Sequence, residues 1–142
     1  MLHSDTELAA LLGQVKTIAI VGAKDKPGQP VDRIGRYLME AGFTVIPVHP
    51  KRTSVWGLAA YPTLADVPHP VDLVDLFRAP EYCPDHARET LALAERPRGF
   101  WMQSGIISAE ARGLLRGSGI IVVEDRCLMV DHARLLGGGA NG

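Results

Sequence analysis

The stretch Thr17-Ile18-Ala19-Ile20-Val21-Gly22-Ala23, followed by Lys24-Asp25-Lys26-Pro27-Gly28-Gln29-Pro30, decides the fold. An apolar run rich in β-branched residues ends on Gly22, a basic loop with glycine and proline follows, and a helix then begins near Val31. In α/β proteins this order of strand, loop and helix builds a phosphate site, because the loop presents backbone N–H groups and the helix N-terminus adds partial positive charge. The stretch therefore predicts a nucleotide-type ligand.

Strand-like and helix-like patterns alternate along the rest of the chain. Nearly continuous apolar runs predict buried strands at residues 16–22, 43–48, 71–77, 99–102 and 119–123. Amphipathic spacing predicts helices at residues 4–13, 31–41, 85–95, 108–116 and 125–136, the first with Ser4 and Glu7 as a capping box. We expect one short strand within residues 55–61 and a short helix or turn at 63–66. The alternation predicts a three-layer α/β fold with a mostly parallel sheet and helices on both faces.

The composition is that of an ordinary globular protein. The chain has 142 residues, 46% of them apolar, and a formal net charge of −1. We expect one domain over residues 1–136, large enough to bury roughly 68–70% of the unfolded surface, and a flexible glycine-rich tail over residues 137–142. Cys83 and Cys127 form neither a metal motif nor a disulfide framework, and the histidines lack ligand spacing, so no metal site is expected.

Charge and hydropathy also limit which classes of partner and which cellular location are expected. The near-zero net charge favours neither nucleic acid nor a membrane surface. The apolar runs are strand-sized, far short of the ~20 residues that span a bilayer. The first residues lack the basic start and apolar stretch of a signal peptide. We therefore expect a cytoplasmic protein, either a monomer or a homodimer, that binds neither nucleic acid nor membranes.

The site is expected beyond the carboxyl ends of the strands, because ligands of open parallel sheets bind there. Those ends lead into five short segments, at residues 22–25, 49–52, 77–80, 103–105 and 124–127.

The loop sequences narrow the choice of nucleotide. The dinucleotide fingerprint G-x-G-x-x-G and the P-loop pattern are both absent after Val21. The second strand ends in His49-Pro50-Lys51-Arg52 rather than in the acidic residue that binds an unphosphorylated ribose. Cations at this position favour a phosphorylated ribose, as in NADP or coenzyme A, over NAD. The alternative interpretation is that Lys51 and Arg52 form a solvated turn.

At this point the chain resembles a known family, the small stand-alone CoA-binding proteins. These are similar to the N-terminal CoA-binding domain of the succinyl-CoA synthetase α-subunit. The resemblance covers roughly residues 15–135 and depends on the order and spacing of several segments. They are Ile18-Ala19-Ile20-Val21-Gly22-Ala23, Asp25-Lys26-Pro27, Val45-Ile46-Pro47-Val48-His49-Pro50-Lys51, Tyr61-Pro62-Thr63-Leu64-Ala65-Asp66-Val67-Pro68, Val71-Asp72-Leu73-Val74-Asp75-Leu76-Phe77-Arg78, Trp101-Met102-Gln103-Ser104-Gly105 and Asp125-Arg126-Cys127.

The resemblance implies a Rossmann-like fold, coenzyme A as the ligand, and a pose for it. Backbone N–H groups of the phosphate loop would wrap the pyrophosphate, helped by the Lys26 side chain; the loop residues are Gly22, Ala23, Lys24, Asp25 and Lys26. Pro50 and Lys51 would border the adenosine end, with Lys51 near the 3′-phosphate. The remaining residues would follow the adenine or the pantetheine arm, with Cys127 towards the far end; they are Phe77, Arg78, Ala79, Met102, Gln103, Ser104, Gly105 and Cys127.

Cys127 has three interpretations. Its neighbours Arg126 and Asp131 would suit an activated nucleophile, a small residue near the ligand would simply pack, and the thiol could form a mixed disulfide with CoA. Ser104 lacks the G-x-S-x-G frame of a nucleophilic serine. Asp72 and Asp75 are three residues apart on a strand and face opposite sides, which argues against an acid–base pair.

These observations predict a domain that binds coenzyme A or an acyl-CoA non-covalently, as a carrier, sensor or regulatory module with a protein partner. Catalytic residues are not expected, because the catalytic histidine of the synthetase relatives lies in a domain that this chain does not contain. The alternative is a small NADP-dependent reductase, or an acyl-CoA-processing enzyme that uses Cys127.

Overall fold

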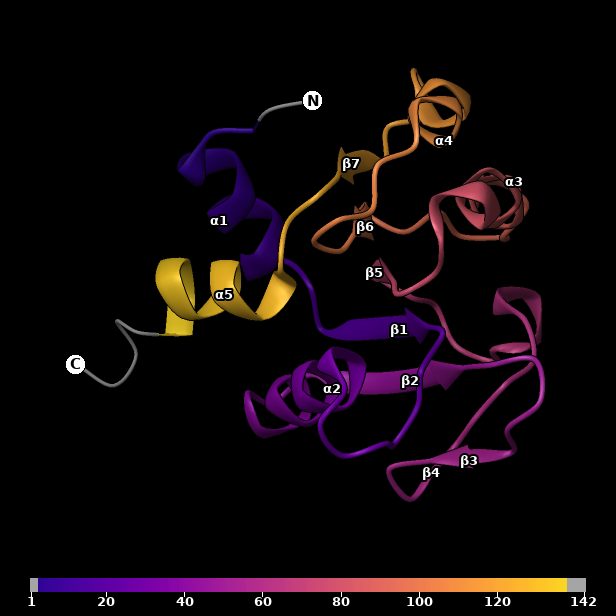
Figure 1. Ribbon diagram of the computed structural model, residues 1–142. Helices are drawn as coiled ribbons and strands as arrows, with labels where there is room; N and C mark the ends of the chain where they lie inside the picture. The colour runs from indigo at the N-terminus through magenta and orange to yellow at the C-terminus, as the bar shows by residue number, and fades with distance from the viewer. Residues whose placement is uncertain (1–2, 138–142) are drawn as a thin grey trace.

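Five parallel strands form the central sheet of the computed structural model, which describes residues 3–137 (Figure 1). The strands are β1 (Thr17–Val21), β2 (Thr44–Val48), β5 (Leu73–Leu76), β6 (Gly99–Met102) and β7 (Ile121–Val123). Their spatial order is β2-β1-β5-β6-β7. In this order the chain turns back at β1, so the switch point lies between β1 and β5, where doubly wound sheets bind ligands. The expected parallel sheet is confirmed.

Helices cover both faces of the sheet, as expected (Figure 1). One face packs against α1 (Asp5–Gly13), α2 (Pro30–Glu40) and α5 (Leu128–His132) around a core that includes Ile20 and Trp101. The other face packs against α3 (Cys83–Leu91) and α4 (Ala109–Leu115) around a core that includes Phe100 and Met102. Because adjacent strand residues point to opposite faces, the continuous apolar runs supply both cores.

The helix ends have local causes, and the one predicted from the sequence is confirmed. Ser4 caps α1, and its capping box with Glu7 is complete. Ser108 caps α4 by accepting the Ala111 N–H. Gly42 follows α2 with φ +99°, a backbone conformation that favours glycine.

The structure differs from expectation most clearly in three regions, and β5 and β7 are also shorter than the predicted strands. The segment expected to hold one short strand forms a hairpin of two, β3 (Ser54–Val55) and β4 (Leu58–Ala59). Helix α3 begins at Cys83 rather than 85 and ends at Leu91, preceded by the 3-10 turn η2 (Pro80–Tyr82); a second such turn, η1, spans Leu64–Asp66. The final helix begins at Leu128, because Asp125 adopts φ +57° and interrupts a helical path.

The final helix continues as a π-helical segment, η3 (Ala133–Gly137). Gly137, the first residue of the expected tail, is the last residue of this segment. The rest of that tail, residues 138–142, lies outside the described residues.

Candidate functional site

Three adjoining cavities open at the carboxyl ends of β1 and β5. The large cavity, of about 550 Å³, lies between the start of α2 and the segments after β5 and β6. The loop cavity, of about 300 Å³, lies between the loop after β1 and the end of β2. The small cavity, of about 130 Å³, lies beside Pro50 and α3. The site therefore occupies the switch point that the strand order defines.

Arg78 lines all three cavities. Its guanidinium stacks on the Tyr82 ring, 4.3 Å from the ring centroid. Its Nε atom is buried and has no hydrogen-bond partner, and the side chain has no carboxylate partner within residues 3–137. A buried guanidinium donor without a partner is costly, so the junction of the cavities favours an anion.

The loop after β1 presents fewer free amides than the sequence suggested. The N–H groups of Gly22 and Ala23 donate to the Val48 carbonyl at 2.9 and 3.3 Å. The N–H groups of Lys24, Asp25 and Lys26 have no partner within the described chain. Of the five amides expected to wrap an anion, two therefore donate to the end of β2 in this structure, and three are free of such bonds.

Gly22 has a structural role at the same place. It adopts φ +90°, and a Cβ here would lie 2.5 Å from the Phe77 carbonyl oxygen. Glycine therefore allows the ends of β1 and β5 to approach each other, and this approach brings Arg78 to the cavities.

Helix α2 points its N-terminus at the loop cavity, which Gln29, Pro30 and Val31 line. The N-cap residue Gln29 makes no side-chain capping bond. Pro30 has no N–H, and the N–H groups of Asp32 and Arg33 donate to the Gln29 carbonyl. The Val31 N–H has no partner within the described chain, so this group and the helix dipole remain for another acceptor.

His49, at the end of β2, adds a neutral donor to the loop cavity. Its Nδ1 atom accepts the backbone N–H groups of Lys51 (3.1 Å) and Arg52 (3.2 Å). The proton of the neutral ring must then lie on Nε2. Burial lowers the pKa of His49, and nearby cations, Arg52 and Lys24 foremost, lower it further.

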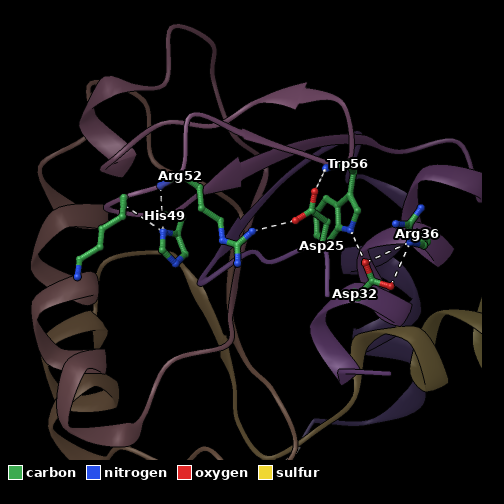
Figure 2. Close-up of polar contacts among 7 residues, drawn as sticks. Asp25, Asp32, Arg36, His49, Arg52 and Trp56 are labelled. Atoms are coloured by element: carbon green, nitrogen blue, oxygen red, sulfur yellow. Dashed lines mark hydrogen bonds and ion pairs between the residues drawn. The ribbon is translucent and has the colours of Figure 1, made fainter. Parts of the chain in front are cut away.

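A chain of polar contacts ties the loop, the hairpin and α2 together (Figure 2). Asp25 accepts from Arg52 Nη1 at 2.9 Å and from the Trp56 backbone N–H at 3.3 Å. The Trp56 indole N–H donates to Asp32 at 2.9 Å, and Asp32 also pairs with Arg36. These contacts hold the loop after β1 against the β3–β4 hairpin.

The large cavity has a different character. Apolar side chains line much of it, among them Ile34, Phe77, Ala79 and Ile106. Its polar wall includes Gln103, whose Oε1 accepts the Leu128 N–H at 3.1 Å, and the half-buried Cys127. Such a lining suits a long, largely apolar group with a few carbonyls.

The three cavities bring together a large part of the predicted site. The predicted residues that line them are Gly22, Lys24, Pro50, Phe77, Arg78, Ala79, Gln103, Ser104 and Cys127. Those that do not are Ala23, Asp25, Lys26, Lys51, Met102 and Gly105. Met102 is fully buried in the core on the α3 and α4 side, because it alternates in direction with Gln103.

Sequence reasoning missed residues at the start of α2, two single positions, and the small-cavity residues Val21, Val48, Pro62, Thr63, His86 and Glu89. Gln29, Pro30 and Val31 could have been found from the predicted helix start. Arg33 and Ile34 line the large cavity one turn further along, and Ile106 lies in an irregular segment without a pattern. His49 stood in the quoted motif but was not selected, because its ring orientation depends on the turn that follows it.

Asp72, which directly precedes β5, and Asp75, within it, have separate environments. Asp72 accepts the N–H groups of Lys16 and Thr17, both at 2.9 Å, and thereby caps β1. Asp75 lies in register between Ile20 and Trp101 and is fully buried. Both of its oxygens lack a partner within residues 3–137, and burial raises its pKa well above the ordinary value. Neither residue lines the three cavities.

The described residues form neither a metal-binding cluster nor a membrane-spanning helix. No group of three or more His, Cys, Asp or Glu side chains there is arranged to hold a metal ion. None of the helices within residues 3–137 combines the length and the apolar character that crossing a membrane requires.

Comparison with known proteins gives a family match and close structural relatives. The model of the family described as "CoA binding domain" matches residues 16–133. The Bacillus subtilis protein YneT is 34% identical over 130 residues, which cover 92% of this chain and 95% of YneT.

Solved structures of similar chains have the same fold. A Thermus thermophilus protein, cell-free ID.343, is 46% identical with a TM-score of 0.88 and coverage of 94% and 100% of the two chains. A hypothetical protein of Pyrococcus horikoshii OT3 is 33% identical with a TM-score of 0.89 and coverage of 94% and 93%. A dinucleotide-forming acetyl-coenzyme A synthetase of Ca. Korarchaeum cryptofilum shares the fold (21% identity, TM-score 0.67), with 78% of this chain on 26% of that one.

Proposed function

Because the chain belongs to the family of CoA-binding domains, we propose that it binds coenzyme A or an acyl-CoA reversibly across the three cavities. The observation that carries this proposal is the environment of the Arg78 guanidinium. Its buried donor has no partner within the described residues, and it stands where the three cavities meet. A diphosphate at this junction would supply the missing acceptor and counter-charge.

In this proposal the diphosphate occupies the loop cavity. The free backbone N–H of Lys24, the N-terminus of α2, the Lys24 ammonium and the His49 Nε2–H all supply donors of the right kind there. The pantetheine arm extends into the large cavity, and Lys51 approaches the 3′-phosphate from the end of β2. The absence of an acidic residue at the end of β2 favours this ligand over NAD.

We further propose that the protein acts as a carrier or sensor of the ligand, delivering it to or reading it for a protein partner. The Cys127 thiol makes no hydrogen bond to a base within residues 3–137, whereas a catalytic thiol needs one in reach. Pull-down experiments with and without CoA would test for a partner that depends on the ligand.

Ligand-dependent thermal unfolding tests the central proposal. A ligand that binds the folded state raises the melting temperature, and CoA is expected to raise it more than NADP or NAD. Arg78→Gln is expected to weaken CoA by about tenfold to a hundredfold, the loss of a charge-assisted hydrogen bond.

The matched control is Arg116→Gln, which makes the same charge change at an exposed residue at the C-terminus of α4. A larger stabilisation by NADP than by CoA would favour the reductase alternative. Mass spectrometry of the natively purified protein would identify any ligand that copurifies.

A further inference from the structure

The side-chain amide of Gln103 has a fixed orientation. The residue is only 4% exposed. Its Oε1 atom accepts the backbone N–H of Leu128 at 3.1 Å, and an N–H donor can be met only by the oxygen of the carboxamide. The nitrogen, Nε2, must therefore be the atom on the other side.

Nε2 is a donor without a protein acceptor. No residue within the described chain accepts from it, yet Gln103 lines the large cavity, where Ile34, Phe77 and Ile106 are apolar. A donor held in such surroundings favours a ligand that carries an acceptor, because leaving it unpaired on binding costs free energy.

The donor belongs to the end of the large cavity formed by the segments that follow β6 and β7, whereas the loop cavity lies at the ends of β1 and β2. Leu128, which holds Gln103, directly follows Cys127, so the amide and the thiol belong to one wall. The loop-cavity residues Gly22, Lys24 and His49 do not line the large cavity; Pro30, Phe77 and Arg78 form the junction between the two. A ligand with its diphosphate in the loop cavity would bring its opposite end to Gln103.

We propose that this end of the large cavity receives a thioester, so that the protein prefers an acyl-CoA to free CoA. Gln103 Nε2–H donates to the thioester carbonyl oxygen, and the acyl chain packs on Ile34 and Ile106. A free thiol would not serve as well, since sulfur is a weak acceptor and a carbonyl oxygen a strong one. This inference depends on the proposed function, but it makes Gln103 a specificity-determining residue.

The test compares ligands that differ in one group. Acetyl-CoA carries the carbonyl, and S-ethyl-CoA has a methylene in its place. Calorimetry on the wild type is expected to show acetyl-CoA binding about threefold to tenfold more tightly, the effect of one neutral hydrogen bond.

Two variants assign the effect to Gln103. Gln103→Met removes the donor, and Gln103→Glu removes it while keeping an acceptor for the Leu128 N–H, which guards against a folding defect. At a pH high enough to ionise the introduced carboxyl group, whose pKa burial raises, both are expected to bind the two ligands equally. Gln14→Met, at an exposed glutamine after α1, is expected to keep the preference.

Each result decides the matter. Equal wild-type affinities for acetyl-CoA and S-ethyl-CoA would overturn the inference and leave CoA binding intact. A preference for acetyl-CoA that persists in both Gln103 variants would also overturn it. So would an equal loss of affinity for all CoA compounds, because the hydrogen bond would then belong to a pantetheine amide. The compound 3′-phosphoadenosine 5′-diphosphate lacks the pantetheine arm. If neither it nor CoA bound, the proposed function would be overturned as well.

Discussion

Arg52 Nη1 lies 2.9 Å from Asp25 Oδ1, so a cation at the end of β2 is held by the phosphate loop itself. Both side chains are about one-third exposed, and such a pair contributes on the order of 1 kcal/mol or less. Its larger consequence concerns charge. Arg52 is compensated by Asp25, whereas the exposed Lys51 side chain has no partner within residues 3–137.

Lys51 is therefore expected to respond to the 3′-phosphate. Lys51→Ala should weaken CoA by about threefold to tenfold, the worth of one partly screened charge-assisted bond. It should affect dephospho-CoA much less, because that ligand lacks the phosphate. Calorimetry with both ligands measures the difference.

Arg52→Gln is the matched comparison. Arg52 acts on the loop through Asp25, so its removal should weaken the binding of CoA and of dephospho-CoA by a similar factor. Equal losses in Lys51→Ala would remove Lys51 from this role.

Gly35 of α2 makes room for Trp56. A Cβ at Gly35 would lie 2.2 Å from the indole Cη2 atom. Gly35→Ala should therefore displace the ring, break its bond to Asp32, and destabilise the fold by about 1–3 kcal/mol. Urea unfolding measures the loss, and the fluorescence maximum reports the move of Trp56.

Gly113→Ala in α4 serves as the control, because a Cβ there meets nothing within 4 Å. It should stabilise the protein by about 0.4–1 kcal/mol. Equal effects of the two substitutions on stability would show that the position of the Trp56 indole does not depend on the lack of a side chain at Gly35.

Asp75 is expected to make stability depend on pH. Burial raises its pKa well above the ordinary value, so the folded state binds a proton that the unfolded state releases above about pH 3.9. The resulting stability is complete below that pH and is lost as the pH rises through the folded-state pKa. Asp75→Asn should therefore gain stability relative to the wild type as the pH increases from 4 to 8.

Urea unfolding of both proteins across that range measures the trend. A stability difference that stays constant from pH 4 to 8 would mean that Asp75 titrates normally in the folded protein.

The two thiols should react very differently. Cys83 is fully buried, and burial raises its pKa to about 11, whereas Cys127 is partly exposed at the large cavity. Because the thiolate is the reactive form, iodoacetamide near neutral pH should modify Cys127 first. Peptide mass spectrometry locates the label.

Ligands should separate the two ends of the site in the same assay. CoA should protect Cys127, whereas 3′-phosphoadenosine 5′-diphosphate should not, because it has no arm to fill the large cavity. Labelling of Cys83 at a comparable rate would show that α3 opens.

The strands and helices could largely be predicted because they depend on local pattern. Apolar runs and amphipathic spacing located the strands of the sheet and the helices that cover it, and Ser4 with Glu7 predicted the start of α1. The β3–β4 hairpin was missed because its turn places Trp56 at φ +55°, a conformation that no sequence pattern signals for tryptophan.

By itself the sequence determined the order of strands and helices, the glycine where β1 meets β5, and the edge of the sheet where the cavities open. These follow from interactions between neighbours along the chain and from the rule that parallel strands end together. The tertiary structure alone decided which groups at that edge are free to bind.

The Val48 carbonyl accepts the N–H groups of Gly22 and Ala23, and Asp25 pairs with Arg52. The Leu128 N–H donates to Gln103 Oε1 and so orients the Gln103 Nε2 donor. Each of these pairings joins residues far apart in the sequence. A hydrogen bond or ion pair depends on the distance between two atoms, and only the folded chain sets that distance.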